Sequence, residues 1–395
     1  MPIFWTVLIV LALGALGFVL GQRRALASAG DDHRKLHSRP IYYGWHVALV
    51  TAVPALLALI CWLLIDNESA LRLAPATLVI AVAGMGFALA HISRAFRARN
   101  AVEQVIRGLL ILSSTIAILT TIGIVLSLVF ESISFFRLYP WQSFFFGLEW
   151  TPAFQGNSSL GVLPLLWGTL YISLIALLVA VPIGLFAAIY MSEYAAPRIR
   201  GLVKPAIEIL AGIPTIVYGL FALVTVGPLL RDWIAQPTGL GEGASSVMTA
   251  GLVMGIMLIP FVSSLSDDII NAVPQSLRDG SLGLGSTHSE TITKVVLPAA
   301  LPGIVGAILL AASRAIGETM IVVLGAGAMA QISGNPFEAM TTITTRIVSQ
   351  LTGDNDFASP ETLVAFALGL TLFVLTLGLN VLALYIVRKY REQYE

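Results

Sequence analysis

Residues 161–190 form an uninterrupted apolar run, GVLPLLWGTLYISLIALLVAVPIGLFAAIY, in which no residue carries a charge. About 20 consecutive apolar residues are enough for a helix to cross the hydrocarbon core of a bilayer, so this run can tilt or extend beyond the lipid. The same criterion finds eight further spans, at residues 3–20, 44–65, 74–91, 108–130, 207–230, 246–265, 300–327 and 361–387. The sequence therefore predicts an all-α polytopic membrane protein with nine transmembrane helices.

The composition supports this prediction and excludes several classes of function. Hydrophobic residues make up 57% of the chain and charged residues only 11%, against about 25% charge in soluble domains, and the mean hydropathy is +0.88. The formal net charge is zero, which leaves no electrostatic footprint for nucleic acid. Cys61 is the single cysteine and the five histidines are scattered, so the sequence predicts no intramolecular disulfide, no Cys/His metal cluster and no cofactor.

The distribution of Lys and Arg predicts how the chain lies in the membrane. With nine spans and an external N-terminus, 17 of the 22 basic residues fall in cytoplasmic segments and 4 in external ones, as the positive-inside rule requires. The first apolar run has no basic residue before it and is followed by Arg23 and Arg24, the reverse of a cleavable signal peptide. We therefore expect a permanent N-terminal anchor, an external N-terminus and a cytoplasmic C-terminus.

The cytoplasmic loop 266–299 carries a motif with defined spacing. It consists of an acidic residue and two small ones, then a glycine, then a Leu-Pro pair: Asp279, Gly280, Ser281, Gly285, Leu297 and Pro298. This spacing resembles the EAA loop of ABC importer permeases, which is E-A-A, three residues, G, nine residues, I-x-L-P; the first three residues and Val295 depart from it in identity. The alternative is an ordinary helical loop between two spans.

The physical requirement behind such a loop is mechanical. A separate ATPase has to push on the membrane domain, so a short helix must protrude into the cytoplasm and dock in a cleft of the ATPase. We expect Gly285 to permit a sharp turn after this helix. We expect Leu297-Pro298 to stop the chain before it re-enters the membrane.

A second motif, RAIGETM, occupies residues 314–320 inside the predicted span 300–327. A charge at the bilayer centre costs about 2.5–3.5 kcal/mol on insertion scales, so such residues face the interior of a bundle. Arg314 and Glu318 are four residues apart and would share one helix face, where they could pair. One interpretation is a buried structural ion pair. The other is an anion-handling site, because a guanidinium suits a phosphate-like oxyanion.

Four segments together resemble the phosphate ABC importer permeases: Arg314–Met320, Glu208–Leu220 (EILAGIPTIVYGL), Met191–Tyr194 (MSEY) and the loop 279–298. The Met320 that follows GET is similar to the C-type subunit, PstC, since the A-type subunit, PstA, more often continues with Ala-Pro. The resemblance covers residues 101–395, a six-helix permease core of the type I importer kind. Residues 1–100, with three additional spans, form an N-terminal extension without an assigned role.

The resemblance implies a set of partners and a location. A permease of this kind acts in the inner membrane of a bacterium with a PstA-like second permease, an ATPase dimer and a periplasmic phosphate-binding protein. It also implies that Arg314 and Glu318, together with Thr319 of the same motif, line the route of phosphate. Transport would proceed by alternating access, powered by ATP hydrolysis in the partner.

The motifs that are absent argue against an enzyme. No GxxxxGK[ST] phosphate loop, Ser/His/Asp arrangement or HExxH motif occurs in the sequence. ATP hydrolysis must therefore come from another subunit. Two other hypotheses stay open on the sequence: an importer for another oxyanion such as sulfate, and a non-transporting membrane scaffold or sensor.

Two further features lead to weaker expectations. The segment 191–206, flanked by Glu193 and Glu208, carries three basic residues and is predicted to be a solvated, positively charged loop, with contact to the ATPase surface as the alternative. Gly212-Ile213-Pro214 and the prolines at 182 and 260 are expected to interrupt spans, and broken spans can serve a substrate path or a hinge.

Overall fold

The structure is a computed structural model, and it describes residues 3–30, 36–65, 67–153, 158–353 and 359–391. The chain forms two compact units, Met1–Gly123 and Ile124–Glu395, which meet inside the long helix α4 (Ala98–Leu138). The domain boundary at residue 100 stays a prediction. Each unit is described by itself.

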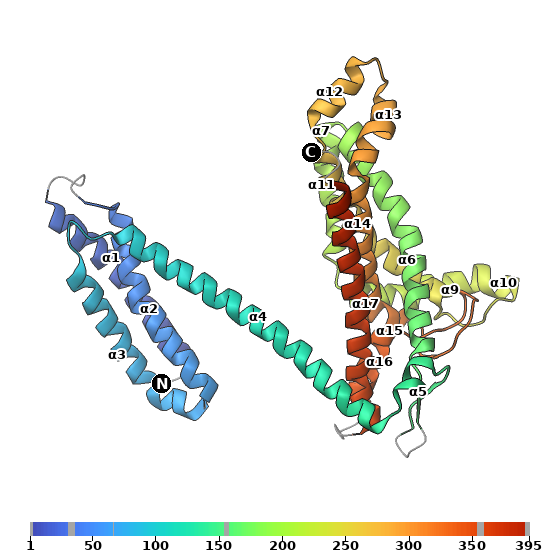
Figure 1. Cartoon of the computed structure of the whole chain (residues 1–395), viewed down its shortest axis with the longest axis horizontal. Coiled ribbons are helices and arrows are strands. Elements are labelled where there is room, and N and C mark those ends of the chain that lie inside the picture. Colours follow the sequence, from blue (N-terminus) through green and yellow to red (C-terminus); the bar gives the residue numbers. More distant parts are fainter. Residues whose placement is uncertain (1–2, 31–35, 66, 154–157, 354–358, 392–395) are drawn as a thin grey trace. The chain divides into compact units, whose positions relative to one another are not determined.

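The first unit is a bundle of three helices, α1 (Ile3–Ala29), α2 (Pro40–Ile65) and α3 (Asn67–His91), followed by the first part of α4 (Figure 1). Glycine allows the helices to approach closely: a Cβ added at Gly21 would lie 2.8 Å from the Tyr43 carbonyl oxygen, and one at Gly84 would lie 2.5 Å from the Val50 carbonyl oxygen. Small residues at helix contacts are the usual basis of packing in a membrane, where apolar side chains gain nothing by leaving lipid.

The second unit begins with the C-terminal part of α4, which is followed by a short connecting region and a helical bundle. Its elements up to the central helix are α5 (Trp141–Phe146), β1 (Trp150–Thr151), β2 (Ser159–Leu160), α6 (Leu163–Ile189), α7 (Pro197–Ala211), α8 (Thr215–Phe221), α9 (Gly227–Leu230), α10 (Gln236–Thr238) and α11 (Val247–Asn271). The two strands pair antiparallel, with Trp150 opposite Leu160. Between Tyr190 and Ala235, three π-helical turns join or extend these helices: η2 (Tyr190–Tyr194), η3 (Ala222–Val226) and η4 (Arg231–Ala235).

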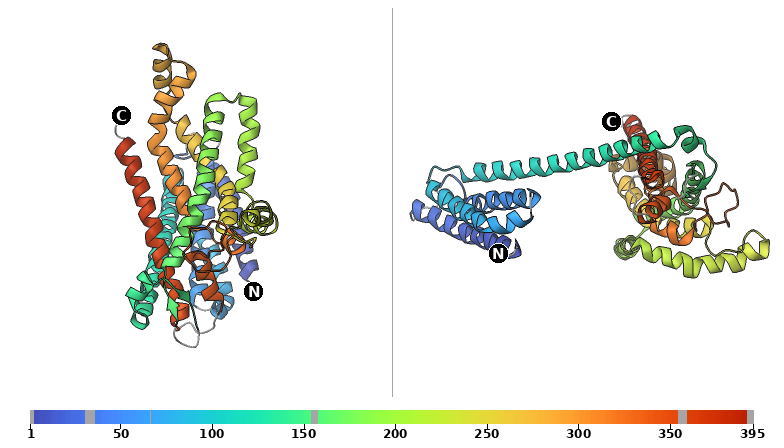
Figure 2. Two further views of the ribbon diagram at one scale, coloured as in Figure 1. Left: turned by 90° about the vertical axis from the view of Figure 1, so that its right-hand side faces the viewer. Right: turned by 90° about the horizontal axis from the view of Figure 1, so that it is seen from below.

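The remaining elements complete the bundle and its two ends. They are α12 (Gln275–Gly283), α13 (His288–Thr291), the π-helical turn η5 (Ile292–Val296), α14 (Leu297–Ile316), α15 (Met320–Gly325), α16 (Ile343–Gly353) and α17 (Pro360–Arg391). Within this unit, α12, α13 and the C-terminal end of α17 lie at one end, and α5 and the strands lie at the other (Figures 1 and 2).

The centre of the second unit is the contact between α6 and α11. Gly251 and Gly255 on α11 face Ile175 and Val179 on α6, so closely that an added Cβ would lie under 3 Å from those side chains. Ile172, Met254 and Leu258 are almost wholly buried in the same cluster. This apolar contact holds the frame on which the charged residues of the unit are placed.

The predicted spans agree with the helices in most places. Among the described residues, eight helices are long and apolar enough to cross a membrane, and the span expected at 74–91 corresponds to a shorter apolar stretch, Pro75–His91. The all-α membrane fold is therefore confirmed.

The proline predictions are confirmed in one place and wrong in two. Gly212-Ile213-Pro214 does break the chain between α7 and α8, because Pro214 has no N–H and disfavours helical backbone at the residue before it. Pro182 and Pro260 instead lie inside the continuous helices α6 and α11. Neighbouring groups in a packed membrane bundle can satisfy the carbonyl that such a proline leaves free.

Candidate functional site

The RAIGETM motif lies at a helix break and not inside one span. Arg314 occupies the last turn of α14, which ends at Ile316, and α15 begins only at Met320. The Glu318 side chain accepts a hydrogen bond from the Met320 N–H at 3.1 Å and so satisfies a donor at the start of α15. The expectation of a continuous span over 300–327 is therefore wrong, because the Glu318 side chain bonds the backbone locally in place of a helical hydrogen bond.

The break changes the relation between the two charges. Arg314 and Glu318 no longer share a helix face, and no ion pair joins them in the part of the chain that the structure describes. The Arg314 guanidinium instead lies 5.8 Å from the centroid of the Phe261 ring. Arg314 is exposed in the single chain, so its guanidinium is free to bind an anion or to contact another subunit. The contact that the structural ion-pair interpretation requires is thus missing.

The residues around the break are held by threonine hydroxyls. Thr319 donates to the Gly317 carbonyl at 3.4 Å, and Thr344 in α16 donates to the Glu318 carbonyl at 2.8 Å. The N–H of Ile343 donates to the Thr169 hydroxyl of α6 at 3.1 Å. The break therefore rests on the first turn of α16, which is tied in turn to α6.

Arg346 is a cation near this region that the sequence reasoning counted only as an external charge. Its Nη2 donates to the Ala328 carbonyl, its Nε is buried without a partner, and none of the described carboxylates forms an ion pair with it. Burial lowers the pKa of the Arg346 guanidinium. The sequence signal that could have pointed to Arg346 is the run TTITTR at residues 341–346, in which four threonines precede the cation.

The loop between α11 and α14 has the form that its spacing predicts. α12 is a short helix, and Gly285 has φ +88°, a left-handed value that confirms the turn expected there. Asp279 and Gly280 are exposed, with Asp279 accepting a hydrogen bond from Gln275 at 3.0 Å. Leu284 is 90% exposed, more than the other leucines of α12 and its turn, Leu277 and Leu282.

One residue of the motif is less accessible than the others, and one predicted detail of the loop is wrong. Ser281 is buried, and its side chain points across the loop, where its hydroxyl lies 3.0 Å from the Thr291 hydroxyl. Leu297-Pro298 does not stop the chain: one helix runs from His288 to Ile316. The π-helical turn η5 directly precedes the pair, and the Leu297 N–H bonds to the Ile292 carbonyl, so the helix widens next to the missing N–H of Pro298.

The segment 191–206 is helical and not a loop, although none of the residues of α7 is buried. Most of it forms η2 and α7, and Arg200 and Lys204 on α7 bind Asp267 on α11. The Asp267 side chain is wholly buried, and Arg200 Nη2 lies 3.0 Å from each of its carboxylate oxygens. Its hydrogen bond with Lys204 raises the pKa of that amine. The positive charges therefore hold α7 against α11, which no sequence pattern had suggested.

Glu193 is the other residue of this segment that the structure places differently. Its side chain is only 5% exposed and forms an ion pair with Arg278 of α12. Sequence reasoning treated Glu193 as a flank of the loop because its partner lies 85 positions away. Glu208, by contrast, is exposed.

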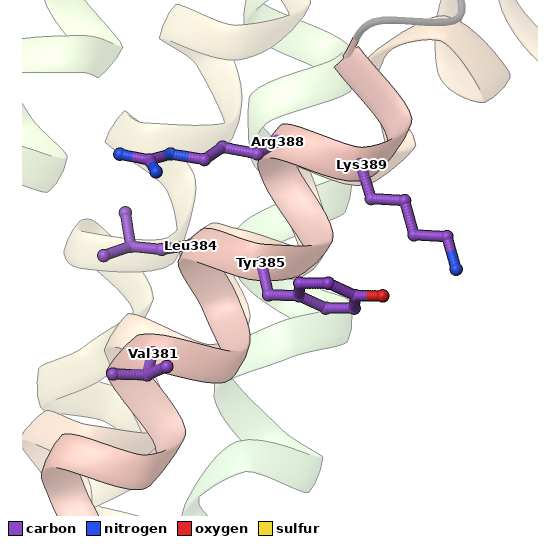
Figure 3. Close-up of a pocket in the computed structure, with 5 residues that line it drawn as sticks. All are labelled: Val381, Leu384, Tyr385, Arg388 and Lys389. Carbon is purple, nitrogen blue, oxygen red and sulfur yellow. The ribbon is translucent and has the colours of Figure 1, made fainter.

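A surface hollow of about 400 Å³ lies along the end of α17 and is not part of these sites. It is lined by one helix alone, and Figure 3 shows Leu384 and Arg388 pointing to one side while Tyr385 and Lys389 point to the other. Lys389 Nζ lies 5.6 Å from the Tyr385 ring centroid. Aromatic and basic residues at a helix end are typical anchors at a membrane interface.

Comparisons with known proteins place this arrangement among transport proteins. The family described as "Binding-protein-dependent transport system inner membrane component" matches residues 180–392, and one described as "Phosphate ATP-binding cassette transporter" matches residues 7–70. The phosphate transport system permease protein PstC of Mesorhizobium japonicum is 34% identical over 62% of this chain and 78% of its own length. PstC of Haemophilus influenzae is 31% identical over 76% of this chain and 98% of its own length.

The crystal structure of a bacterial alginate ABC transporter, in complex with an alginate-pentasaccharide-bound periplasmic protein, matches with a TM-score of 0.49 at 16% identity. That match covers 73% of this chain and 97% of the other chain.

Proposed function

The chain belongs to the binding-protein-dependent transport system inner membrane component family, and from this premise we propose that it is the permease subunit of an ATP-driven phosphate importer. It is a multi-pass protein of the inner membrane, and permeases of this family work with an ATPase and a substrate-binding protein. Phosphate as the cargo is supported by the names of relatives at 31–34% identity. ATP hydrolysis takes place in the partner, so the chain is not itself an enzyme.

The observation that carries the proposal is the exposed position of Arg314 at the end of α14. A guanidinium without a carboxylate partner in the described residues, exposed at the end of a broken helix, is a binding group for an oxyanion. Glu318 and Thr319 lie on the non-helical turn beside it and shape the same part of the route. Because Arg314 is exposed in the single chain, a second permease subunit, similar to PstA, completes the route on that side.

The loop with α12 is the contact for the ATPase. Asp279, Gly280 and the strongly exposed Leu284 present a surface that a cleft can receive, and Gly285 reverses the chain behind it. Ser281 supports the loop from inside, while Leu297 and Pro298 lie at the start of α14, where the loop returns to the bundle.

The orientation of the chain in the membrane is inferred from the distribution of Lys and Arg and from the position of the C-terminal helix in the second unit. We place the C-terminus in the cytoplasm, because α17 ends on the same side as α12 and α13. The N-terminus is then periplasmic if the short apolar stretch Pro75–His91 also crosses the bilayer. Reporter fusions at both ends test this orientation, and a cytoplasmic N-terminus would refute it.

The test of the function is uptake of radiolabelled inorganic phosphate by the complete transporter in proteoliposomes. Arg314→Gln is expected to abolish uptake while the complex still assembles, since Arg314 serves the route and not the packing. Arg198→Gln is a matched control, because Arg198 is exposed on α7 and makes no ion pair among the described residues. Full uptake by the Arg314 variant, or transport of sulfate in place of phosphate by the wild type, would overturn the proposal.

A further inference from the structure

The MSEY segment, residues 191–194, forms most of η2 at the end of α6 and has no role in the function proposed above. Glu193 within it is held by the loop that carries α12. Arg278 of α12 binds the Glu193 carboxylate through Nη1 and donates from Nη2 to the Ile270 carbonyl of α11 at 2.8 Å. The Arg278 and Glu193 side chains are only 13% and 5% exposed, so the ion pair is shielded from water.

The other arm of the loop also contacts this segment. The Nε2 atom of His288 lies 3.1 Å from the Glu193 carbonyl oxygen, and the His288 ring meets the edge of the Tyr194 ring with centroids 5.4 Å apart. The hydroxyls of Ser281 and Thr291 join the two arms to each other at 3.0 Å. Both arms of the loop therefore contact the C-terminal end of η2.

The Glu193–Arg278 contact links the loop to a helix that does not adjoin it along the chain. Along the chain, the loop is connected to α11 at one end and to α14 at the other. The Glu193–Arg278 pair joins it to α6 as well. Removing one partner of a buried ion pair leaves the other charge without compensation, which is strongly unfavourable, so the pair resists separation when α12 is displaced.

We propose that the Glu193–Arg278 ion pair is the link through which movement of α12 reaches α6. Glu193 and Arg278 are thus positioning residues that act between the ATPase contact and the helix bundle, and neither touches the transported anion. This inference rests on the proposed function in one respect, that an ATPase acts on α12. The competing explanation is that the pair only braces the folded loop.

The two explanations differ in what they predict for the complete transporter. Glu193→Gln and Arg278→Gln should each leave an assembled complex that hydrolyses ATP, while the amount of phosphate moved per ATP falls by about tenfold, within the range of coupling energies between contacting residues. The exchanged pair, Glu193→Arg with Arg278→Glu, should recover most of this ratio. Lys294→Gln is the control, because Lys294 pairs with Glu290 on the same loop but is 71% exposed.

A second measurement does not depend on the cargo. After replacement of Cys61, spin labels at Ser289 on the α13 arm of the loop and Phe186 on α6, both exposed and outside the proposed ATPase contact, report the distance between the two elements with and without ATP. We expect this distance to stay constant in the wild type and to change with ATP in Glu193→Gln. If phosphate does not move in the wild type, the proposed function fails, yet this distance still tests the link.

Three results would overturn the inference. The single variants could keep the wild-type ratio of phosphate to ATP, the Ser289–Phe186 distance could behave alike in wild type and Glu193→Gln, or neither single variant could assemble. The last result would show that the pair is needed for folding and is only a brace.

Discussion

Asp267→Asn is expected to loosen α7 from the bundle. None of the residues of α7 is buried, and its closest polar links to α11 are the bonds from Arg200 and Lys204 to the wholly buried Asp267 carboxylate, at 2.8–3.0 Å. Charge-assisted hydrogen bonds contribute about 1.5–3 kcal/mol each, and the amide keeps one acceptor oxygen. Arg200 and Lys204 are 34% and 31% exposed and can be partly rehydrated. We therefore estimate a net loss of about 2–3 kcal/mol.

Hydrogen exchange of the purified protein measures this loss directly. A loss of about 2–3 kcal/mol in the free energy of local opening corresponds to exchange about 30–150 times faster in α7. Asp268→Asn is the matched control: Asp268 is 67% exposed and lies 3.6 Å from Lys204, so its pair should contribute under about 1 kcal/mol. Equal exchange rates in the two variants, or an unchanged rate in Asp267→Asn, would refute the reasoning.

Three further outcomes are expected. Gly285→Val should insert normally but lose most substrate-stimulated ATP hydrolysis, because a β-branched residue is strained at φ +88°; normal stimulation would contradict this. With Cys61 replaced, a cysteine at Leu284 should cross-link to the ATPase and one at Ser281 should not, since Ser281 is buried; the reverse pattern would refute the assignment of the contact. Gly84→Ala should lower the free energy of unfolding by about 1–3 kcal/mol in a thermal unfolding experiment, because the added Cβ would clash with the backbone of α2. Gly86→Ala should leave this free energy unchanged, because nothing lies within 4 Å of the added Cβ.

The transmembrane class and the form of the α12 loop were predictable from the sequence. An uncharged run such as 161–190 has to be helical and in contact with lipid, whatever its neighbours are. The turn at Gly285 follows from the spacing of the loop, and its positive φ is a local property of the backbone. The motif RAIGETM also pointed to Arg314, but a hydropathy window could not find the break at residues 317–319, because it averages these three residues with the longer apolar runs before and after the motif.

The ion pairs of the second unit were decided only by the tertiary structure. Glu193 pairs with Arg278, and Arg200 and Lys204 pair with Asp267, across separations of 85, 67 and 63 positions. Seen along the chain, these residues are ordinary charges at the ends of apolar runs. Their burial depends on the packing of α6, α7, α11 and α12 against one another, and a charge becomes a structural link only when that packing removes water from it.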